Sequence, residues 1–234
     1  MKKHYLLTFL LCSLIGWAQI PAGYYNTATG TGLTLKTNLK KIIDNVSDGI
    51  PSEHLHSDQG YAALWTLYTH TAFRDNYYEN DSSLLDMYSE NPTGNDPYIY
   101  ANTTQQCGSY SGEGDCYNRE HLIPQSYFDG FATNPMKNDP FFVVPSDGKV
   151  NGDRNNLPFG KVGTATYTSQ KKSKRGNGIN SGYASGYSGV VFEPIDEFKG
   201  DVARAYFYFA TLTEINMSIF FPTPVPVPVH QKNF

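Results

Sequence analysis

Residues suited to phosphodiester hydrolysis occur in two short segments of the chain, residues 117–124 and residues 150–156. The first contains Glu120 and His121, and the second contains Asn151. A neutral imidazole accepts a proton near neutral pH, so His121 is the candidate general base. Magnesium takes only one or two protein oxygens besides water and phosphate, and Glu120 with the Asn151 carbonyl oxygen supplies them. The set predicts metal-assisted hydrolysis.

The metal is expected to act as a Lewis acid that stabilises the departing 3′ oxygen. A nonbridging phosphate oxygen is expected to be held by Arg119 or Arg154. Arg119 is predicted, together with His121, to be a catalytic residue. Adjacent residues of a strand point to opposite faces, so Glu120 and His121 reach one phosphate only at a strand end or a bend. Pro124 and the glycine beside Asn151 favour such local irregularity.

Each of these residues also has an ordinary structural interpretation. His121 alone is compatible with a core or surface histidine held by a carbonyl group. Glu120 is compatible with a surface ion pair to Arg119 or Arg154, and Asn151 with a turn or helix-terminal residue. An Arg-Glu-His tripeptide is therefore weak evidence without the second segment.

A strand, a connection, a second strand and a short helix are expected to position these residues. Residues 119–124 and 141–145 are apolar runs typical of strands, and residues 146–155 predict a short helix capped by Ser146. Apolar spacing predicts longer helices elsewhere, and polar, Gly-rich composition predicts loops. The expected helices are residues 36–46, 60–74 and 200–215, and the expected loops are residues 76–114, 171–175 and 176–190.

The N-terminus has the features of a secretory signal peptide over residues 1–18: Lys2 and Lys3, an apolar stretch, and Gly16-Trp17-Ala18 before the cleavage site. Its removal leaves Cys107 and Cys116. An even number of cysteines in a secreted chain predicts one disulfide bond, and closing so short a loop stabilises the fold by roughly 2–3 kcal/mol.

Charge and composition are those of an acidic globular protein, with a formal net charge of −4 and 39% hydrophobic residues. Residues 119–175 nevertheless contain nine Lys and Arg against five Asp and Glu. A local basic surface of this kind suits salt-sensitive contact with phosphate backbones. The basic run at residues 171–175 taken alone indicates a solvated loop.

Three stretches closely resemble the endonuclease I family of secreted and periplasmic bacterial nucleases: residues 107–121, 145–160 and 198–205. The resemblance extends from about residue 20 to residue 211. It implies an α+β fold with a ββα-metal (HNH-like) core, and magnesium-dependent cleavage of DNA and often RNA to 5′-phosphate products. It also implies His121 as general base and Glu120 and Asn151 as ligands of one Mg²⁺ ion, for which Mn²⁺ or Ca²⁺ substitutes in binding. Arg154, Lys149 and Arg204 are expected to contact substrate.

Two departures from the family pattern leave an alternative open, although the intact Glu120, His121 and Asn151 favour the nuclease. Phe142 stands where family members usually carry a histidine, and residues 212–234 end in a Pro-Val-rich tail instead of further helices. The alternative is an impaired nuclease fold that binds nucleic acid or a surface partner without cutting it. A third interpretation, zinc binding by His54 and His56, lacks further Cys or His ligands nearby, and a polar turn is favoured.

The expected organisation is therefore a signal peptide over residues 1–18, a nuclease-like domain over residues 19–215, and an atypical tail over residues 216–234. The leading prediction is a secreted or periplasmic, monomeric, nonspecific endonuclease. Its partners are DNA and RNA, contacted through the phosphate backbone, and it is not expected to bind membranes.

Overall fold

The computed structural model of the chain describes residues 20, 22–51, 55, 57–101, 104–127, 137–178 and 189–214. It divides into two compact units, one ending at Leu55 and the other beginning at His56. Helices and strands are mixed, which confirms the α+β class. The predicted signal peptide, the Pro-Val tail and the His54 and His56 pair lie outside the described residues.

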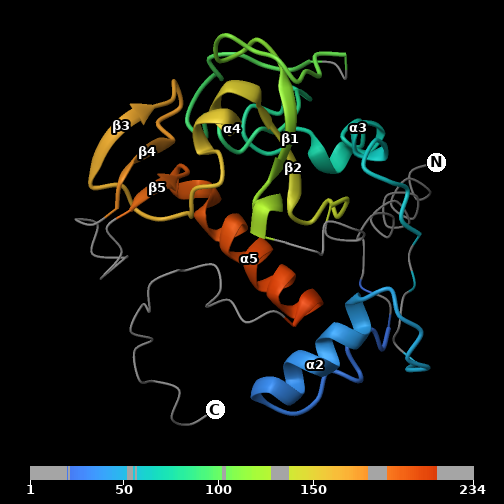
Figure 1. Cartoon of the computed structure of the whole chain (residues 1–234). Coiled ribbons are helices and arrows are strands. Elements are labelled where there is room, and N and C mark those ends of the chain that lie inside the picture. The colour runs from blue at the N-terminus through green and yellow to red at the C-terminus, as the bar shows by residue number, and fades with distance from the viewer. Residues whose placement is uncertain are drawn as a thin grey trace, which may run out of the picture. The chain divides into compact units, whose positions relative to one another are not determined.

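The N-terminal unit contains the helix α2, Gly32–Ile43 (Figure 1). It begins four residues before the predicted start and ends three residues before the predicted end. Asp44 explains the early end, because its backbone is extended and its carboxylate accepts a hydrogen bond from the Val46 backbone N–H at 3.2 Å. Ile42 is the residue of this helix that is fully buried.

A ββα unit lies at the centre of the second unit. Strand β1, Tyr117–His121, pairs antiparallel with β2, Val143–Asp147, so that Tyr117 faces Asp147 and His121 faces Val143. Helix α4, Gly148–Arg154, follows directly and packs on both strands. Figure 1 shows α4 between this strand pair and a second sheet. The predicted order of strand, connection, strand and short helix is confirmed.

The predicted cap of α4 was wrong by one residue. Asp147, not Ser146, is the N-cap, and its Oδ1 accepts a hydrogen bond from the Val150 backbone N–H at 2.8 Å. Its other oxygen accepts the Tyr100 hydroxyl at 2.5 Å and the Gly114 N–H at 2.8 Å. Ser146 is fully buried within β2. The Tyr100 hydroxyl and the Gly114 backbone N–H, both from the loop before β1, therefore hold Asp147 as the cap, and the local sequence does not reveal these partners.

The second sheet was not predicted. Its strands β3 (Thr164–Thr168), β4 (Lys174–Asn177) and β5 (Val190–Glu193) pair antiparallel in chain order. The predicted loops were therefore wrong for β4 and for Val190, while residues 179–188 lie outside the described residues. A Cβ on Gly176 would lie 2.1 Å from the Thr164 carbonyl oxygen, so the close pairing of β3 and β4 requires glycine there.

Two further predicted helices differ from the observed ones in extent. The segment 60–74 forms only the short helix α3, Ala63–Leu67, and the 3₁₀ helix η1, Thr71–Phe73. His70 separates them, because its backbone is extended and its Nδ1 accepts the Ala72 N–H at 3.2 Å. The C-terminal helix α5, Asp196–Thr213, begins four residues early, with acidic residues in its first turn.

The described residues of the predicted loop 76–114 form neither a helix nor a strand, which confirms that prediction. A short 3₁₀ helix η2, Gln125–Tyr127, follows β1. In the part of the chain that the structure describes, we find no helix with the length and apolar character needed to cross a membrane.

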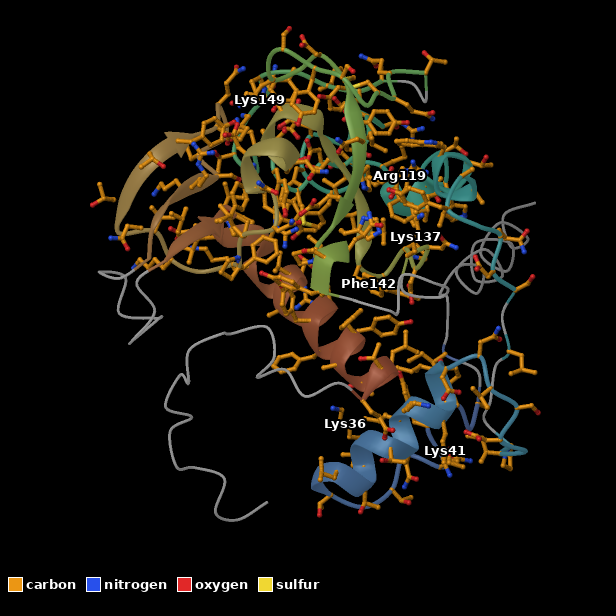
Figure 2. All side chains as sticks on the ribbon, viewed as in Figure 1. Lys36, Lys41, Arg119, Lys137, Phe142 and Lys149 are labelled. Atoms are coloured by element: carbon orange, nitrogen blue, oxygen red, sulfur yellow. A yellow bond between two sulfur atoms is a disulfide. The ribbon has the colours of Figure 1, made fainter. Side chains whose placement is uncertain are left out.

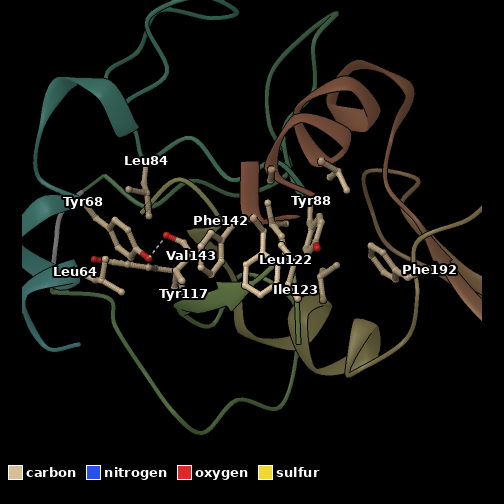
Figure 3. Close-up of a cluster of buried hydrophobic side chains, with 14 of the residues drawn as sticks. Leu64, Tyr68, Leu84, Tyr88, Tyr117, Leu122, Ile123, Phe142, Val143 and Phe192 are labelled. Atoms are coloured by element: carbon tan, nitrogen blue, oxygen red, sulfur yellow. Dashed lines mark hydrogen bonds between the residues drawn. The ribbon is translucent and has the colours of Figure 1, made fainter. Parts of the chain in front are cut away.

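The core joins the ββα unit to α3 and α5. Tyr68 of the segment after α3 is fully buried and donates a hydrogen bond to the Val143 carbonyl at 3.0 Å. Phe142, labelled in Figure 2 and Figure 3, is also fully buried and packs edge-on against Phe209 of α5, with ring centroids 5.1 Å apart. The residue that departs from the family pattern is thus part of the hydrophobic core.

Candidate active site

The inner face of β1 meets α4 through two pairs of polar side chains. Asn118 and Glu120 lie on one face of the strand, because side chains alternate along it. The Asn151 amide donates a hydrogen bond to Asn118 Oδ1 at 2.6 Å, and Arg154 Nη1 lies 2.9 Å from Glu120 Oε1. Asn151 and Arg154 are neighbours on one side of a helix because they are three residues apart. The structure thereby brings Glu120 and Asn151 to the same interface.

Arg154 is the buried centre of this interface. Only 1% of its side chain is exposed. Besides Glu120, its guanidinium donates hydrogen bonds to the His121 carbonyl at 2.7 Å and the Leu122 carbonyl at 2.5 Å. It also lies over the ring of Phe159. These contacts hold the end of β1 against α4, so the guanidinium is used within the protein and is not presented to a phosphate.

Glu120 is a buried carboxylate, with 2% of the residue exposed. Its Oε1 accepts the Tyr88 hydroxyl at 2.8 Å in addition to the contact with Arg154. Burial raises the pKa of the Glu120 carboxyl to about 7, while Arg154 and then Tyr88 act in the opposite direction. The predicted ion pair between Glu120 and Arg154 therefore exists, but it is buried instead of lying on the surface.

The opposite face of β1 is cationic and aromatic. The Arg119 guanidinium carbon lies 3.4 Å from the centroid of the Tyr61 ring and 4.2 Å from that of Trp65. Arg119 Nη1 also donates a hydrogen bond to the Tyr61 carbonyl at 2.8 Å. Lys137 lies over the same Tyr61 ring at 5.1 Å, and Figure 2 shows Arg119 and Lys137 on this side of the molecule. Two cations therefore share one aromatic ring.

His121 lies on this face, with its ring centroid 5.6 Å from that of Tyr61. Its Nε2 is 3.1 Å from the Lys137 carbonyl oxygen, and a carbonyl only accepts, so the ring proton is on Nε2. Nδ1 then carries the lone pair and lies 3.3 Å from the Gln125 amide nitrogen. The lone pair of the ring is therefore oriented by its surroundings.

Burial lowers the pKa of His121 to about 4. The Lys137 carbonyl opposes this effect, whereas the positive charges of Arg119, Arg154 and Lys137 add to it. The imidazole is consequently neutral at neutral pH. A neutral imidazole with a fixed tautomer can accept a proton at Nδ1, but the lowered pKa makes it a weaker base than an ordinary histidine.

The predicted convergence is partial. Glu120 and Asn151 share the interface between β1 and α4, but His121 belongs to the other face of the strand. Among the described residues, no hydrogen bond joins Glu120 to Asn151. His121 is, however, the last residue of β1, so a strand end is present beside Glu120 and His121, although the strand was predicted to extend to Pro124.

The other predicted contacts to substrate are dispersed. Lys149, labelled in Figure 2, forms an ion pair with Asp153 and lies over the Tyr167 ring at 5.0 Å. Asp153 also pairs with Arg175 of β4 at 3.0 Å, so residue 175 is not part of a solvated loop as predicted. Arg204 lies on the exposed side of α5, paired with Asp201. Lys149 and Arg204 are therefore on elements other than β1.

The predicted disulfide bond between Cys107 and Cys116 is confirmed. The disulfide bond is connected to the candidate site by the backbone of Cys116. The Cys116 carbonyl accepts hydrogen bonds from the Gly148 N–H at 2.9 Å and from the Tyr100 hydroxyl at 3.1 Å. The bond thus braces the chain just before β1 and the first residue of α4.

Several residues of this arrangement were not identified from the sequence. Asn118 directly precedes the Arg-Glu-His tripeptide, and its position two residues before Glu120 is a usable signal for a shared strand face. Tyr61, Tyr88 and the Lys137 carbonyl carry no comparable signal, because they come from distant loops that only the fold brings to β1.

The donors at the interface fit a hard divalent cation in their chemistry, since Glu120 offers a carboxylate and Asn151 a carboxamide oxygen. The Asn151 amide nitrogen is already bound to Asn118, so Oδ1 is the atom suited to a cation. The Arg154 charge beside Glu120 offsets part of the attraction for a cation.

The chain belongs to the endonuclease I family, whose model matches residues 31–223. This confirms the resemblance expected from the three motifs. Two similar curated proteins are the extracellular ribonucleases of Bacillus subtilis (strain 168) and Bacillus amyloliquefaciens. Each is 29% identical, over 192 and 193 residues, which is 82% of this chain and 54% and 53% of the respective relatives. The chain thus spans about half the length of the curated relatives it matches. No solved structure gives a significant match.

Proposed function

We propose that this protein is a magnesium-dependent endonuclease that hydrolyses phosphodiester bonds in RNA and DNA to 5′-phosphate products. The observation that carries the proposal is the neutral His121, held in one tautomer at the end of β1 and adjacent to Glu120. Membership of the endonuclease I family supports it, as do the two relatives named as ribonucleases. The β1, β2 and α4 unit is proposed to be a ββα-metal core.

His121 Nδ1 accepts a proton from the attacking water, at the position where the Gln125 amide now lies. The water oxygen bonds to phosphorus, the bond from phosphorus to the 3′ oxygen breaks, and that oxygen takes a proton from solvent. The Lys137 carbonyl keeps the Nε2 proton in place, so the imidazole takes up the new proton only at Nδ1.

Arg119 and Lys137 hold the phosphate beside His121. Both side chains make cation–π contacts with the same Tyr61 ring, and both lie close enough to lower the pKa of His121. Their charges attract a phosphate group and stabilise the additional charge that develops during attack. Lys149 and Arg204 contact more distant phosphates of the substrate. Arg154 is a positioning residue, because its side chain is buried.

Glu120 and Asn151 would hold one magnesium ion, which when bound supplies a positive charge that stabilises the departing 3′ oxygen. Tyr88 and Arg154 fix the Glu120 carboxylate, and Asn118 fixes the Asn151 amide. Mn²⁺ and Ca²⁺ are proposed to bind the same oxygens.

We further propose that the protein is secreted after removal of residues 1–18 and acts as a monomer through residues 19–215. The basic and apolar pattern at the N-terminus supports this, and both relatives are named extracellular.

A second candidate is a protein that binds nucleic acid without cutting it. The observation that favours it is that Glu120 Oε1 already contacts both Arg154 and Tyr88, so these two side chains compete with a metal ion for this oxygen. Phe142 adds to it, because a core phenylalanine replaces the histidine that family members usually carry.

Cleavage of supercoiled plasmid and of single-stranded RNA tests the two candidates. The purified protein is incubated with magnesium or with chelator, beside His121→Ala and the matched control His70→Ala, an exposed histidine that caps η1. We expect magnesium-dependent cleavage, a loss of about 10²–10⁴-fold in His121→Ala, and normal cleavage in His70→Ala.

Cleavage that persists in chelator or in His121→Ala would contradict the mechanism. Retention of substrate on a filter without cleavage by the unmodified protein would support the binding function instead.

A further inference from the structure

Three carboxylates from the loop between η1 and β1 form a cluster that includes none of the residues of the β1 and α4 interface. Oxygen atoms of Asp75, Glu79 and Glu90 lie within 4.8 Å of one another. Asp75 and Glu90 are each 1% exposed, and Glu79 is half-buried. Gathering three negative charges in such a place is costly unless something compensates them.

The backbone explains how two of the three are held together. Asp75 Oδ1 accepts the N–H groups of Tyr77 and Tyr78 at 3.1 and 2.9 Å, and Oδ2 accepts those of Glu79 and Asn80 at 3.0 and 3.1 Å. Residues 77–80 therefore wrap around the Asp75 carboxylate. This turn places the Glu79 side chain beside Asp75, independently of any cation.

The buried position of the Glu90 carboxylate is not explained by such hydrogen bonds. Both of its carboxylate oxygens are buried, as is Glu79 Oε1, and none of the three has a hydrogen-bond partner within the described residues. No Lys or Arg of the described chain forms an ion pair with Asp75, Glu79 or Glu90. A buried, unpartnered carboxylate directed at two others is the arrangement that a cation satisfies.

We propose that Asp75, Glu79 and Glu90 bind a divalent cation of the calcium type, at a site separate from Glu120 and Asn151. Calcium is favoured over magnesium because it accepts several carboxylates in flexible geometry, whereas magnesium retains most of its water.

The site has a structural consequence for the candidate active site. Glu90 lies two residues after Tyr88, whose hydroxyl binds Glu120. The Tyr88 ring packs against Phe192, and its carbonyl accepts a hydrogen bond from Ser173 Oγ. A cation that joins Glu90 to Asp75 and Glu79 would therefore stabilise the loop segment that positions Tyr88.

Calcium chloride added to chelator-treated full-length protein tests the proposal. Bound calcium is counted by equilibrium dialysis and the melting temperature is measured for the unmodified protein, Glu90→Gln, Asp81→Asn and Asn151→Ala. Asp81 is a matched control, because it is an exposed carboxylate in the same loop. Asn151→Ala separates this site from the proposed magnesium site.

At a calcium concentration about 100-fold above Kd, we expect the melting temperature of the unmodified protein to rise by about 5–10 °C. Asp81→Asn should show the same rise. Asn151→Ala should bind one calcium ion fewer, because Glu120 and Asn151 are proposed to bind calcium too, but it should retain the rise that the Asp75, Glu79 and Glu90 site contributes. Glu90→Gln should bind one calcium ion fewer than Asp81→Asn and lose most of the rise, while its melting temperature in chelator stays at or above that of the unmodified protein. If Glu90→Gln does not fold, Glu79→Gln gives the same comparison.

Equal calcium counts and equal melting shifts in Glu90→Gln and Asp81→Asn would overturn the proposal. So would the absence of any calcium-dependent shift in the unmodified protein, or the disappearance of the whole shift in Asn151→Ala.

Discussion

Arg154 Nη1 lies 2.9 Å from Glu120 Oε1, and both side chains are almost completely buried. The same guanidinium binds the carbonyls of His121 and Leu122. One residue of α4 therefore holds the proposed metal ligand and the backbone of the proposed general base. The two catalytic functions depend on a single buried cation for their relative position.

Replacement of this cation should destabilise the fold. Arg154→Met leaves Glu120 and two carbonyls without their partner, and we expect the free energy of unfolding to fall by about 3–5 kcal/mol. Urea denaturation at pH 7 measures it. Arg204→Met is the control, because Arg204 is 72% exposed and its pair with Asp201 contributes no more than about 1 kcal/mol. Equal urea midpoints for the two variants would show that the buried pair does not stabilise the protein.

The pH dependence of stability should report the lowered pKa of His121. The folded state has a pKa of about 4 at His121, below the ordinary value near 6.5, so as pH falls the unfolded state takes up the proton first. Stability is therefore lost between pH 6.5 and 4. We expect His121→Asn to gain about 2–3 kcal/mol relative to the unmodified protein when the pH is lowered from 7.5 to 4.5.

The comparison with His121→Asn is needed because Glu120 acts in the opposite direction over an overlapping range. Its raised pKa of about 7 makes the folded state take up a proton first, so this group destabilises the fold as pH rises from about 4.5 to 7. Parallel stability curves for the two proteins between pH 7.5 and 4.5 would mean that His121 has an ordinary pKa.

The cationic face of β1 should determine how binding responds to salt. Lys137→Ala removes one charge from the Tyr61 ring but keeps the carbonyl that binds His121. We expect weaker binding of single-stranded RNA and a slope of log K against log salt that is smaller in magnitude by about 0.7–0.9. Fluorescence anisotropy at several salt concentrations measures the slope. Lys161 is an exposed lysine before β3, and Lys161→Ala should leave this slope nearly unchanged. An unchanged slope in Lys137→Ala would show that Lys137 is not part of the proposed phosphate site.

Loss of the disulfide bond should lower the melting temperature. Its loop is short, because the two cysteines have a sequence separation of 9, and its contribution is about 2–3 kcal/mol. We expect the double variant Cys107→Ser/Cys116→Ser to melt about 4–12 °C below the unmodified protein, as followed by circular dichroism. A reductant should shift only the unmodified protein, and a similar shift in the double variant would assign the effect to something other than this bond.

The sequence alone was sufficient for the local features of the site. Alternation along a strand put Glu120 and His121 on opposite faces and required a strand end or a bend, and β1 ends at His121, three residues before the predicted end at Pro124. The two cysteines predicted their pairing, and the motifs identified the family. These features are local or depend on residue type, so spacing along the chain contains the information.

Tertiary structure decided which side chains surround those residues. Arg154 looks like a phosphate ligand in the sequence, yet packing places it in the core against Glu120. Tyr61, Tyr88 and Lys137 reach β1 from loops, and β4 forms only because β3 and β5 pair with a segment of weak strand propensity. Such contacts join residues tens of positions apart, and local propensity contains no information about which distant partner will be buried against them.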